Sequence, residues 1–228
     1  MERPVILTIK QQVYQYLHDS ILKGEFKPGQ RINEVEIAQD LKVSRSPVHS
    51  AIGELIGEGL LESINNKSVI VRKLSEKQVL DIMDFRNLVE TFAIKKVCEH
   101  MTLDIKQELL GFRNSFLTNN TYDHLVSYTD TDSKFHCFLV DSAGNDIISE
   151  TYHRYTVLLT PFRLISLESR KRFTESIPEH IGIIDAILAK NDEEAIGINK
   201  SHLHLAGEQI VSYFSKLSDP TTKEKHHP

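Results

Sequence analysis

Four residues in the second half of the sequence have the types and spacing of metal ligands. Asp132 and His136 are four residues apart on a predicted helix, so their side chains lie on one face, about one turn from each other. His180 lies at the start of another predicted helix, and His202 lies on the last one. One carboxylate and three imidazoles suit Zn, Ni or Mn and leave positions for water or a ligand if the ion is five- or six-coordinate. Spacing alone leaves the alternatives open, because an Asp-x3-His pair is usually a surface feature and a lone His is more often a core residue.

A second group of residues, in the first half of the sequence, could contact DNA. In a predicted helix that Ser44 can cap, an apolar stripe that includes Val48 and Ile52 faces one way. A helix in the major groove needs Arg for guanine or phosphate, and small hydroxyl residues that let its backbone approach. The face opposite the stripe carries such residues, namely Arg45, Ser46, His49 and Ser50. The alternative is that these are ordinary solvated side chains of a small helical domain.

The elements around this second group are typical of a winged helix-turn-helix. The sequence predicts a helix over 8–23, a short helix capped by Asn33, the helix capped by Ser44, and strands over 60–64 and 69–73. The strands are joined by turn-forming residues, so they form a β-hairpin. Its tip, with Lys67, would then lie near the minor groove or the DNA backbone.

Long helical periodicities fill the rest of the chain. The predicted helices span about 76–99, 102–118, 121–142, 145–168, 176–190 and 192–215, with one of the breaks at Pro178. The fold class is therefore mainly α. We expect a winged helix-turn-helix domain at 1–75, an all-α six-helix bundle at 76–218 and a polar tail at 219–228.

Composition excludes several classes of protein. The 228 residues are 40% hydrophobic and 26% charged, without an apolar run of the roughly 18 residues that a membrane span needs. No secretory signal is visible, and the two cysteines, Cys98 and Cys137, cannot form a disulfide scaffold, so we expect a cytoplasmic protein. Residues 1–75 hold 10 Lys/Arg against 9 Asp/Glu, and the remainder is more acidic. This balance permits DNA binding but does not argue for it.

The first 75 residues resemble the DNA-binding domain of GntR-family bacterial transcription regulators. The similarity covers about 60 residues and is carried by the segments from Lys27 to Glu34 and from Val43 to Ile52, above all by Val-Ser-Arg-Ser-Pro-Val. In that family the Arg that matches Arg45 contacts DNA, which implies the same role here. The candidate DNA-binding residues are Arg31, Ser44, Arg45, Ser46, His49, Ser50 and Lys67. His49 replaces a second Arg and Ser68 replaces a wing-tip Gly, so we expect an operator sequence that differs from the usual one.

Most of residues 76–215 resemble the FCD effector domain of the FadR-like branch of the same regulators. The similarity is carried by 132–136, Asn145, Glu179-His180, 201–203 and the first-helix segment 85–90. Six helices rather than seven are similar to the VanR-type subgroup. In metal-binding members the matching Asp and three His hold the ion, which implies a divalent metal, Zn, Ni or Mn, on Asp132, His136, His180 and His202. His204 and Cys137 should point away from that ion.

Two arginines are candidates for binding an effector. An FCD pocket commonly admits a small organic acid, and a carboxylate near a metal gains most when a guanidinium holds its other end. Arg86, on the first helix of the domain, is the better candidate, and Arg163 is the weaker one. The alternative for each is a surface salt bridge, which we expect more for Arg163.

These observations predict a transcription regulator and not an enzyme. The expected partners are a pseudo-palindromic double-stranded DNA operator, a small organic acid and a second copy of the chain, because two-fold pairing doubles the contact of one small recognition helix. Repression is the expected mode, and no membrane is involved. One alternative is a metal hydrolase with a DNA-targeting module. In that case a general base is needed, and Glu179 adjoins His180 and should point away from it. The other alternative is a regulator with a purely structural metal.

Overall fold

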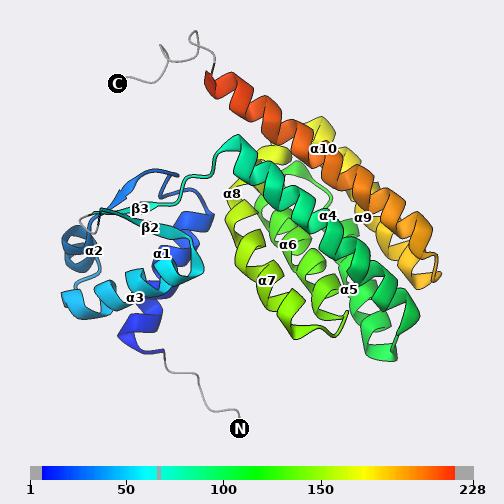
Figure 1. Ribbon diagram of the computed structural model, residues 1–228, viewed down its shortest axis with the longest axis horizontal. Coiled ribbons are helices and arrows are strands. Elements are labelled where there is room, and N and C mark those ends of the chain that lie inside the picture. The colour runs from blue at the N-terminus through cyan, green and yellow to red at the C-terminus, as the bar shows by residue number, and fades with distance from the viewer. Residues whose placement is uncertain (1–6, 66–67, 219–228) are drawn as a thin grey trace. The chain divides into compact units, whose positions relative to one another are not determined.

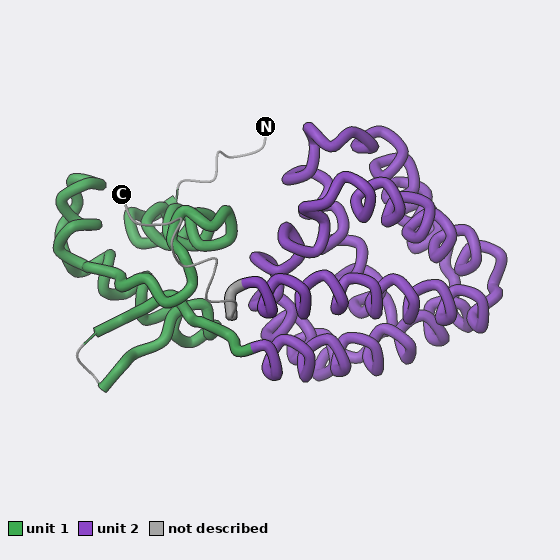
Figure 2. The backbone as a smooth tube through the Cα atoms, turned by 90° about the horizontal axis from the view of Figure 1, so that it is seen from above, with its two compact units in different colours: residues 1–75 green, residues 76–228 purple. Residues whose placement is uncertain are grey.

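The computed structural model describes residues 7–65 and 68–218. The chain divides into two compact units, residues 1–75 and 76–228 (Figure 2). Lys67 and the polar tail at 219–228 lie outside the described residues. In the described part of the chain, no helix has the length and apolar character that crossing a bilayer requires.

The N-terminal unit consists of three helices and a small antiparallel sheet. The helices are α1 (Ile9–Leu22), α2 (Glu34–Asp40) and α3 (Arg45–Glu58), and the strands are β1 (Arg31–Ile32), β2 (Leu61–Ile64) and β3 (Ser68–Val71), in the sheet order β1-β3-β2. The cap predicted for the second helix is present, since the Asn33 side chain accepts a hydrogen bond from the backbone N–H of Val35 at 3.0 Å. Strand β1 was not predicted, because a two-residue strand has no periodicity of its own and depends on pairing with β3.

The core of this unit lies between α1 and α3. Leu17 on α1 and Val48 and Leu55 on α3 have no exposed surface, and Leu61 on β2 has 1%. Gly59 ends α3 in the left-handed conformation, with φ of 82°, which a glycine adopts without a steric cost. The predicted order of helix, helix, turn, helix and hairpin is confirmed.

The C-terminal unit is all helical in the described residues (Figure 1). Its helices are α4 (Glu76–Glu99), α5 (Leu103–Thr118), α6 (Leu125–Asp141), α7 (Asp146–Thr156), α8 (Thr160–Ser166), α9 (Arg170–Leu188) and α10 (Asp192–Ser218). Helix α10 packs against α9, α4 and α8, and α6 packs against α4, α7, α5 and α8. Side chains of Phe116, Tyr128, Phe135 and Ile183 form the centre of the main core.

Two predicted boundaries in this unit are wrong. The helix predicted at 145–168 is divided into α7 and α8 by the 3-10 turn Val157–Leu159, and Pro161 lies in the first turn of α8. This short helix raises the number of helices in the described part of the unit to seven, where six were predicted. Pro178 does not break the helix either but lies inside α9, which begins eight residues earlier at Arg170. The buried neighbours Phe173 and His180 indicate that tertiary packing outweighs the lost backbone hydrogen bond.

Candidate metal centre and DNA-binding face

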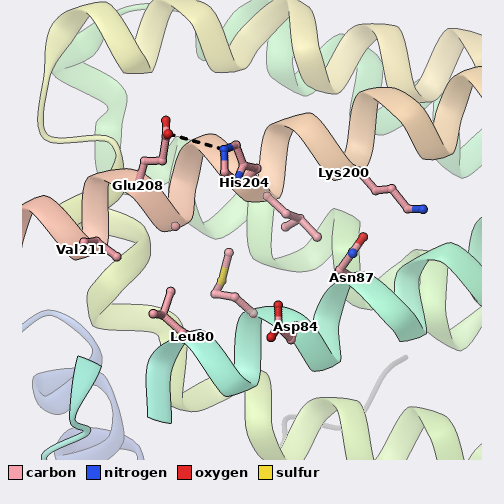
Figure 3. A pocket seen from close by; sticks show the side chains of 10 residues that line it. Leu80, Asp84, Asn87, Lys200, His204, Glu208 and Val211 are labelled. Carbon is pink, nitrogen blue, oxygen red and sulfur yellow. Dashed lines mark ion pairs between the residues drawn. The ribbon is translucent and has the colours of Figure 1, made fainter. Parts of the chain in front are cut away.

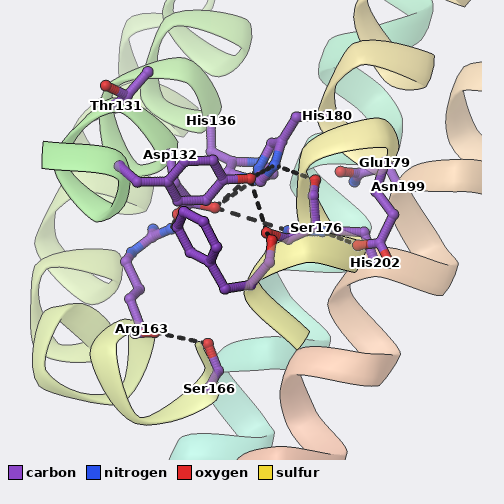
Figure 4. A network of polar contacts seen from close by, with 12 residues as sticks. Thr131, Asp132, His136, Arg163, Ser166, Ser176, Glu179, His180, Asn199 and His202 are labelled. Atoms are coloured by element: carbon purple, nitrogen blue, oxygen red, sulfur yellow. Dashed lines mark hydrogen bonds and ion pairs between the residues drawn. The ribbon is translucent and has the colours of Figure 1, made fainter. Parts of the chain in front are cut away.

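The four predicted metal ligands meet inside the C-terminal unit (Figure 4). Asp132 and His136 come from α6, His180 from α9 and His202 from α10. One ligand atom from each lies within 4.8 Å of the others. The Oδ1 atom of Asp132 is 2.9 Å from the Nε2 atom of His180, 3.7 Å from that of His136 and 3.9 Å from that of His202. The exposed fraction of each of the four residues is 5% or less.

Each of the three imidazoles is oriented by a hydrogen bond that its Nδ1 atom donates to an oxygen outside the cluster. The pairs are His136 with Oε2 of Glu90 (2.9 Å), His202 with Oε2 of Glu179 (2.8 Å) and His180 with the carbonyl oxygen of Ser176 (2.9 Å). Carbonyl and carboxylate oxygens only accept hydrogen bonds, so each ring carries its proton on Nδ1. The lone pairs of the three Nε2 atoms are therefore left for the centre of the cluster, which is the state in which histidines bind metal.

The charges of the cluster also suit a cation. Burial together with the neighbouring His180 lowers the pKa of His202 to about 3, and burial lowers the pKa of His180. Burial alone would raise the pKa of Asp132, but the guanidinium of Arg163, with contacts from the histidines, holds it well below its usual range. The neutral imidazoles of His180 and His202 and the carboxylate of Asp132 thus face each other.

The donor set passes a simple test for a divalent ion. The Nε2 atoms of His136 and His180 are buried and lack a well-formed hydrogen bond, and they face Oδ1 of Asp132 at 3.7 and 2.9 Å. An ion about 2.1 Å from every ligand atom places any two of these atoms within about 4.2 Å. The observed limit of 4.8 Å is close to that value, so the site needs only a small contraction.

Arg86 and Arg163 line the same small cavity beside the cluster. The cavity measures about 20 Å³, roughly the volume of one water, and lies among α4, α8 and α10. Arg163 donates from Nη1 to Oδ2 of Asp132, and Arg86 donates from Nε to Oε1 of Glu90 at 2.8 Å. The expected surface salt bridge is wrong for Arg163, which is 6% exposed, because its partner is a buried carboxylate of another helix. Three further N–H groups have no partner, Arg86 Nη2 and Arg163 Nε and Nη2.

A larger groove of about 370 Å³ runs between α4 and α10 (Figure 3). Leu80 and Val211 lie toward one end, and Asp84, Asn87 and Lys200 lie toward the other. Met83 lines both this groove and the cavity that holds the two arginines. The side chain of Met83 therefore lies between the surface groove and the interior of the unit.

The predicted DNA-binding face of α3 is exposed. The polar residues Arg45, Ser46, His49 and Ser50 are all on the surface, and the predicted apolar stripe with Val48 and Ile52 is buried. His49 is tied to α2 by a contact of 3.0 Å between Nδ1 and Oε1 of Glu34. Ser44 precedes α3 but makes no capping hydrogen bond with its side chain, and Arg31 is exposed on β1.

Sequence reasoning missed the residues that surround the candidate metal ligands. Glu90, Tyr128, Ser176 and Asn199 are buried around the histidines, and none stood out by type or spacing, apart from the helical i, i+4 spacing of Glu90 to Arg86. Glu179 points away from His180 as expected, and its carboxylate is held by Arg172 and His202. His204 is exposed near Glu208 and Cys137 is half-buried, so both predictions for these residues are confirmed.

Two segments of the chain match known protein families. Residues 9–71 match the family described as bacterial regulatory proteins, gntR family. Residues 81–205 match the FCD domain. The two matches fall in the two compact units of the fold.

Individual relatives are transcription regulators by name. The Nta operon transcriptional regulator of Aminobacter aminovorans is 28% identical over 82% of this chain and 87% of its own length. The gluconate operon transcriptional repressor of Bacillus subtilis (strain 168) is 25% identical over 80% of this chain and 76% of its own. Among solved structures, a GntR transcriptional regulator from Rhodococcus sp. RHA1 is 23% identical, covers 89% of this chain and 97% of that one, and has a TM-score of 0.76. At 23% identity, the similarity to the Rhodococcus structure shows the fold alone.

Proposed function

This chain belongs to the gntR family of bacterial regulatory proteins and carries an FCD domain, and from that premise we propose that it is a metal-dependent, acid-responsive repressor. In this proposal the helical unit holds a divalent ion, Zn, Ni or Mn, and binds a small carboxylate beside it. The N-terminal unit binds operator DNA in the cytoplasm through α3, and the acid changes its affinity for that DNA. The activity is regulatory and not enzymatic.

The observation that carries the proposal is the arrangement of charge around the cluster. Three imidazole lone pairs and one carboxylate oxygen converge on one point, and two buried guanidinium groups with unpartnered N–H groups line the cavity beside it. A divalent ion would bind the converging lone pairs, and an organic acid would accept hydrogen bonds from the unpartnered N–H groups. A dicarboxylate can do so while it coordinates the metal, because one end binds the ion and the other binds Arg86 or Arg163.

Binding of the acid requires the cavity to widen. Its present volume of about 20 Å³ is too small for an organic acid, since it accommodates roughly one water. Met83 separates the cavity from the groove between α4 and α10, so a movement of Met83 opens a route from solvent to the two arginines. Such widening displaces α4 or α10, and this gives a physical means for an acid to select one arrangement of the unit.

Operator binding is proposed to occur as a homodimer on a pseudo-palindrome. One recognition helix offers limited contact, and a two-fold dimer places two of them on symmetric DNA. Neighbouring helices α4 and α7 carry the exposed apolar side chains Leu88, 72% exposed, and Ile147, 78% exposed. Leu88 and Ile147 are therefore candidate contacts of the dimer. Sedimentation of Leu88→Lys against wild type tests it, and an unchanged dimer would exclude Leu88 from the interface.

The regulatory proposal is tested by measuring operator affinity with and without acids. Operator DNA is first selected from a random-sequence pool. Di- and hydroxycarboxylates such as succinate, malate and citrate are then titrated against metal-loaded wild type, metal-stripped protein and Arg86→Ala. We expect one acid to change the affinity of the metal-loaded protein about tenfold, which corresponds to about 1.4 kcal/mol of coupling, and to have little effect on the other two. Arg113→Ala, which changes an exposed arginine of the same unit, is the control.

Other outcomes distinguish the alternative functions. An acid that acts equally on all three proteins would place the effector site elsewhere in the unit. A metal that raises the melting temperature while no acid changes DNA affinity would favour a purely structural ion. Metal-dependent hydrolysis of small esters, amides or phosphates that is lost in His180→Ala would favour the hydrolase. Glu179 is not placed to act as the general base of such an enzyme, because Arg172 and His202 occupy its carboxylate.

A further inference from the structure

Glu90 is a fully buried carboxylate that joins four helices. It lies on α4, and its side chain has no exposed surface. Its Oε1 atom accepts hydrogen bonds from Nε of Arg86 at 2.8 Å and from the hydroxyl of Tyr152, on α7, at 2.6 Å. Its Oε2 atom accepts hydrogen bonds from Nδ1 of His136, on α6, at 2.9 Å and from Nδ2 of Asn199, on α10, at 3.0 Å.

All four neighbours are donors, so the site requires an ionised carboxylate. Nε of Arg86, which faces Oε1, and Nδ2 of Asn199, which faces Oε2, can only donate, so a proton on either oxygen would disrupt one of these contacts. The carboxylate thus stabilises one tautomer of His136 and at the same time neutralises Arg86.

We propose that Glu90 is a positioning residue that prepares His136 for the metal ion and transmits occupation of the metal centre to α4. This inference deepens the proposed function and rests on the cluster holding a metal ion. A metal ion bound at Nε2 of His136 would withdraw electron density from the ring and make its Nδ1–H a stronger donor to Glu90. The other oxygen of Glu90 accepts the hydrogen bonds from Arg86 and Tyr152. Helix α4 begins at Glu76, soon after the last strand of the N-terminal unit ends at Val71, so a change in α4 acts on the segment that leads to the DNA-binding unit.

Glu179 provides a matched control within the same site. It plays the same part for His202 that Glu90 plays for His136, since it accepts a hydrogen bond from Nδ1 at 2.8 Å and is paired with an arginine, Arg172. Its side chain is 18% exposed, and these hydrogen bonds connect it to α9 and α10. A change at Glu179 should therefore weaken metal binding without acting on α4.

The first measurement concerns the tautomer of His136 in metal-free protein. Side-chain ¹⁵N NMR of wild type should show His136 protonated on Nδ1, with its signals assigned by their loss in His136→Gln. Glu90→Gln replaces one acceptor oxygen with an amide that donates, and should populate the other tautomer. Glu90→Asp keeps the charge that Arg86 requires but is one methylene shorter, so it should shift the tautomers in the same direction if the glutamine variant does not fold. An unchanged spectrum in the folded variants would overturn the role of Glu90.

The second measurement follows hydrogen exchange of α4 when Zn²⁺ is added. We expect zinc to slow amide exchange in α4 of wild type. Glu90→Gln and Glu90→Asp should bind zinc about 10–100-fold more weakly, which is the usual effect of losing such a partner. At saturating zinc they should still lack the slowing in α4. Glu179→Gln should lose affinity similarly yet keep the slowing at saturation. Wild-type slowing of α4 in the Glu90 variants would contradict the proposal.

The two measurements separate this inference from the proposed function. If wild type binds neither Zn²⁺, Ni²⁺ nor Mn²⁺, the metal-dependent function fails, and transmission through Glu90 fails with it, although the tautomer result stands. If wild type binds metal and the Glu90 variants respond as Glu179→Gln does, the inference fails and the metal-dependent function stands.

Discussion

The two units keep their candidate functional residues in opposite environments. On α3 of the N-terminal unit, Arg45 and His49 are exposed and lie on consecutive turns of one helix. In the C-terminal unit, Asp132, His136, His180 and His202 are buried and come from three helices, and His202 lies 70 positions after Asp132. The first site is built by local structure and the second by tertiary packing.

This difference has an energetic consequence. Replacing an exposed side chain removes an interaction with a partner molecule and leaves the fold nearly unchanged. Replacing a buried charged group leaves its partner uncompensated, so it changes the stability of the fold itself. In the C-terminal unit, binding of the proposed ligands and stability should therefore be coupled, whereas in the N-terminal unit DNA affinity should vary independently of stability.

Arg163→Met should have the largest effect. It leaves the buried carboxylate of Asp132 without its guanidinium, and breaking such a pair costs about 3–5 kcal/mol. Urea unfolding of metal-free protein, followed by circular dichroism, measures the loss. Arg113→Met, which breaks the exposed pair with Asp185, is the control and should cost about 0–1 kcal/mol. Equal losses in the free energy of unfolding for the two variants would show that the buried ion pair is no more important for stability than the exposed one.

His180→Ala should abolish stabilisation by metal. For wild type with free Zn²⁺ at about 100 times its dissociation constant, the ion should add about 2.7 kcal/mol to the free energy of unfolding. The variant should gain little, because one imidazole is missing from the shell. The quantity to compare is the difference with and without zinc, which excludes the effect of the cavity that the alanine leaves. His204→Ala, on the same helix as His202 but exposed, should behave as wild type. A full zinc effect in His180→Ala would remove this residue from the site.

Arg45→Ala should weaken operator binding by about 1–3 kcal/mol if Arg45 contacts a base edge. The free energy of unfolding should stay within about 0.5 kcal/mol of wild type, because the side chain is exposed. Binding is measured at one fixed salt concentration on selected operator DNA. An affinity within twofold of wild type would rule out the contact.

Lys67→Ala should have the smallest effect. Lys67 lies outside the described residues, and its predicted position at the hairpin tip suits a phosphate contact. Loss of one such contact lowers the slope of log affinity against log salt by about 0.9 or less and weakens binding to all sequences alike. A salt titration on operator and on unrelated DNA measures it. A changed base preference would indicate a base contact.

The fold and the sites were predictable to different degrees. The cap of α2, the periodicities of α2 and α3 and the bounds of α4 follow from neighbouring residues, and they were predicted closely. Pro178 was misread, because its local cost in a helix is outweighed by the burial of α9 against other helices. The break between α7 and α8 and the two-residue strand β1 were missed, since neither carries a periodic pattern.

The sequence by itself determined which residues lie on the exposed polar face of α3 and which four residues have the chemistry of metal ligands, because a helix places residues on its faces by their spacing alone. Only the tertiary structure decided that Arg163 is buried against Asp132, that Arg86 and Arg163 share a cavity and that Glu90 connects His136 to α4. The residues in each of these pairs are between 31 and 77 positions apart in the sequence and lie on different helices. Spacing carries no information about them, since they depend on how helices pack and on the charges that burial forces to pair.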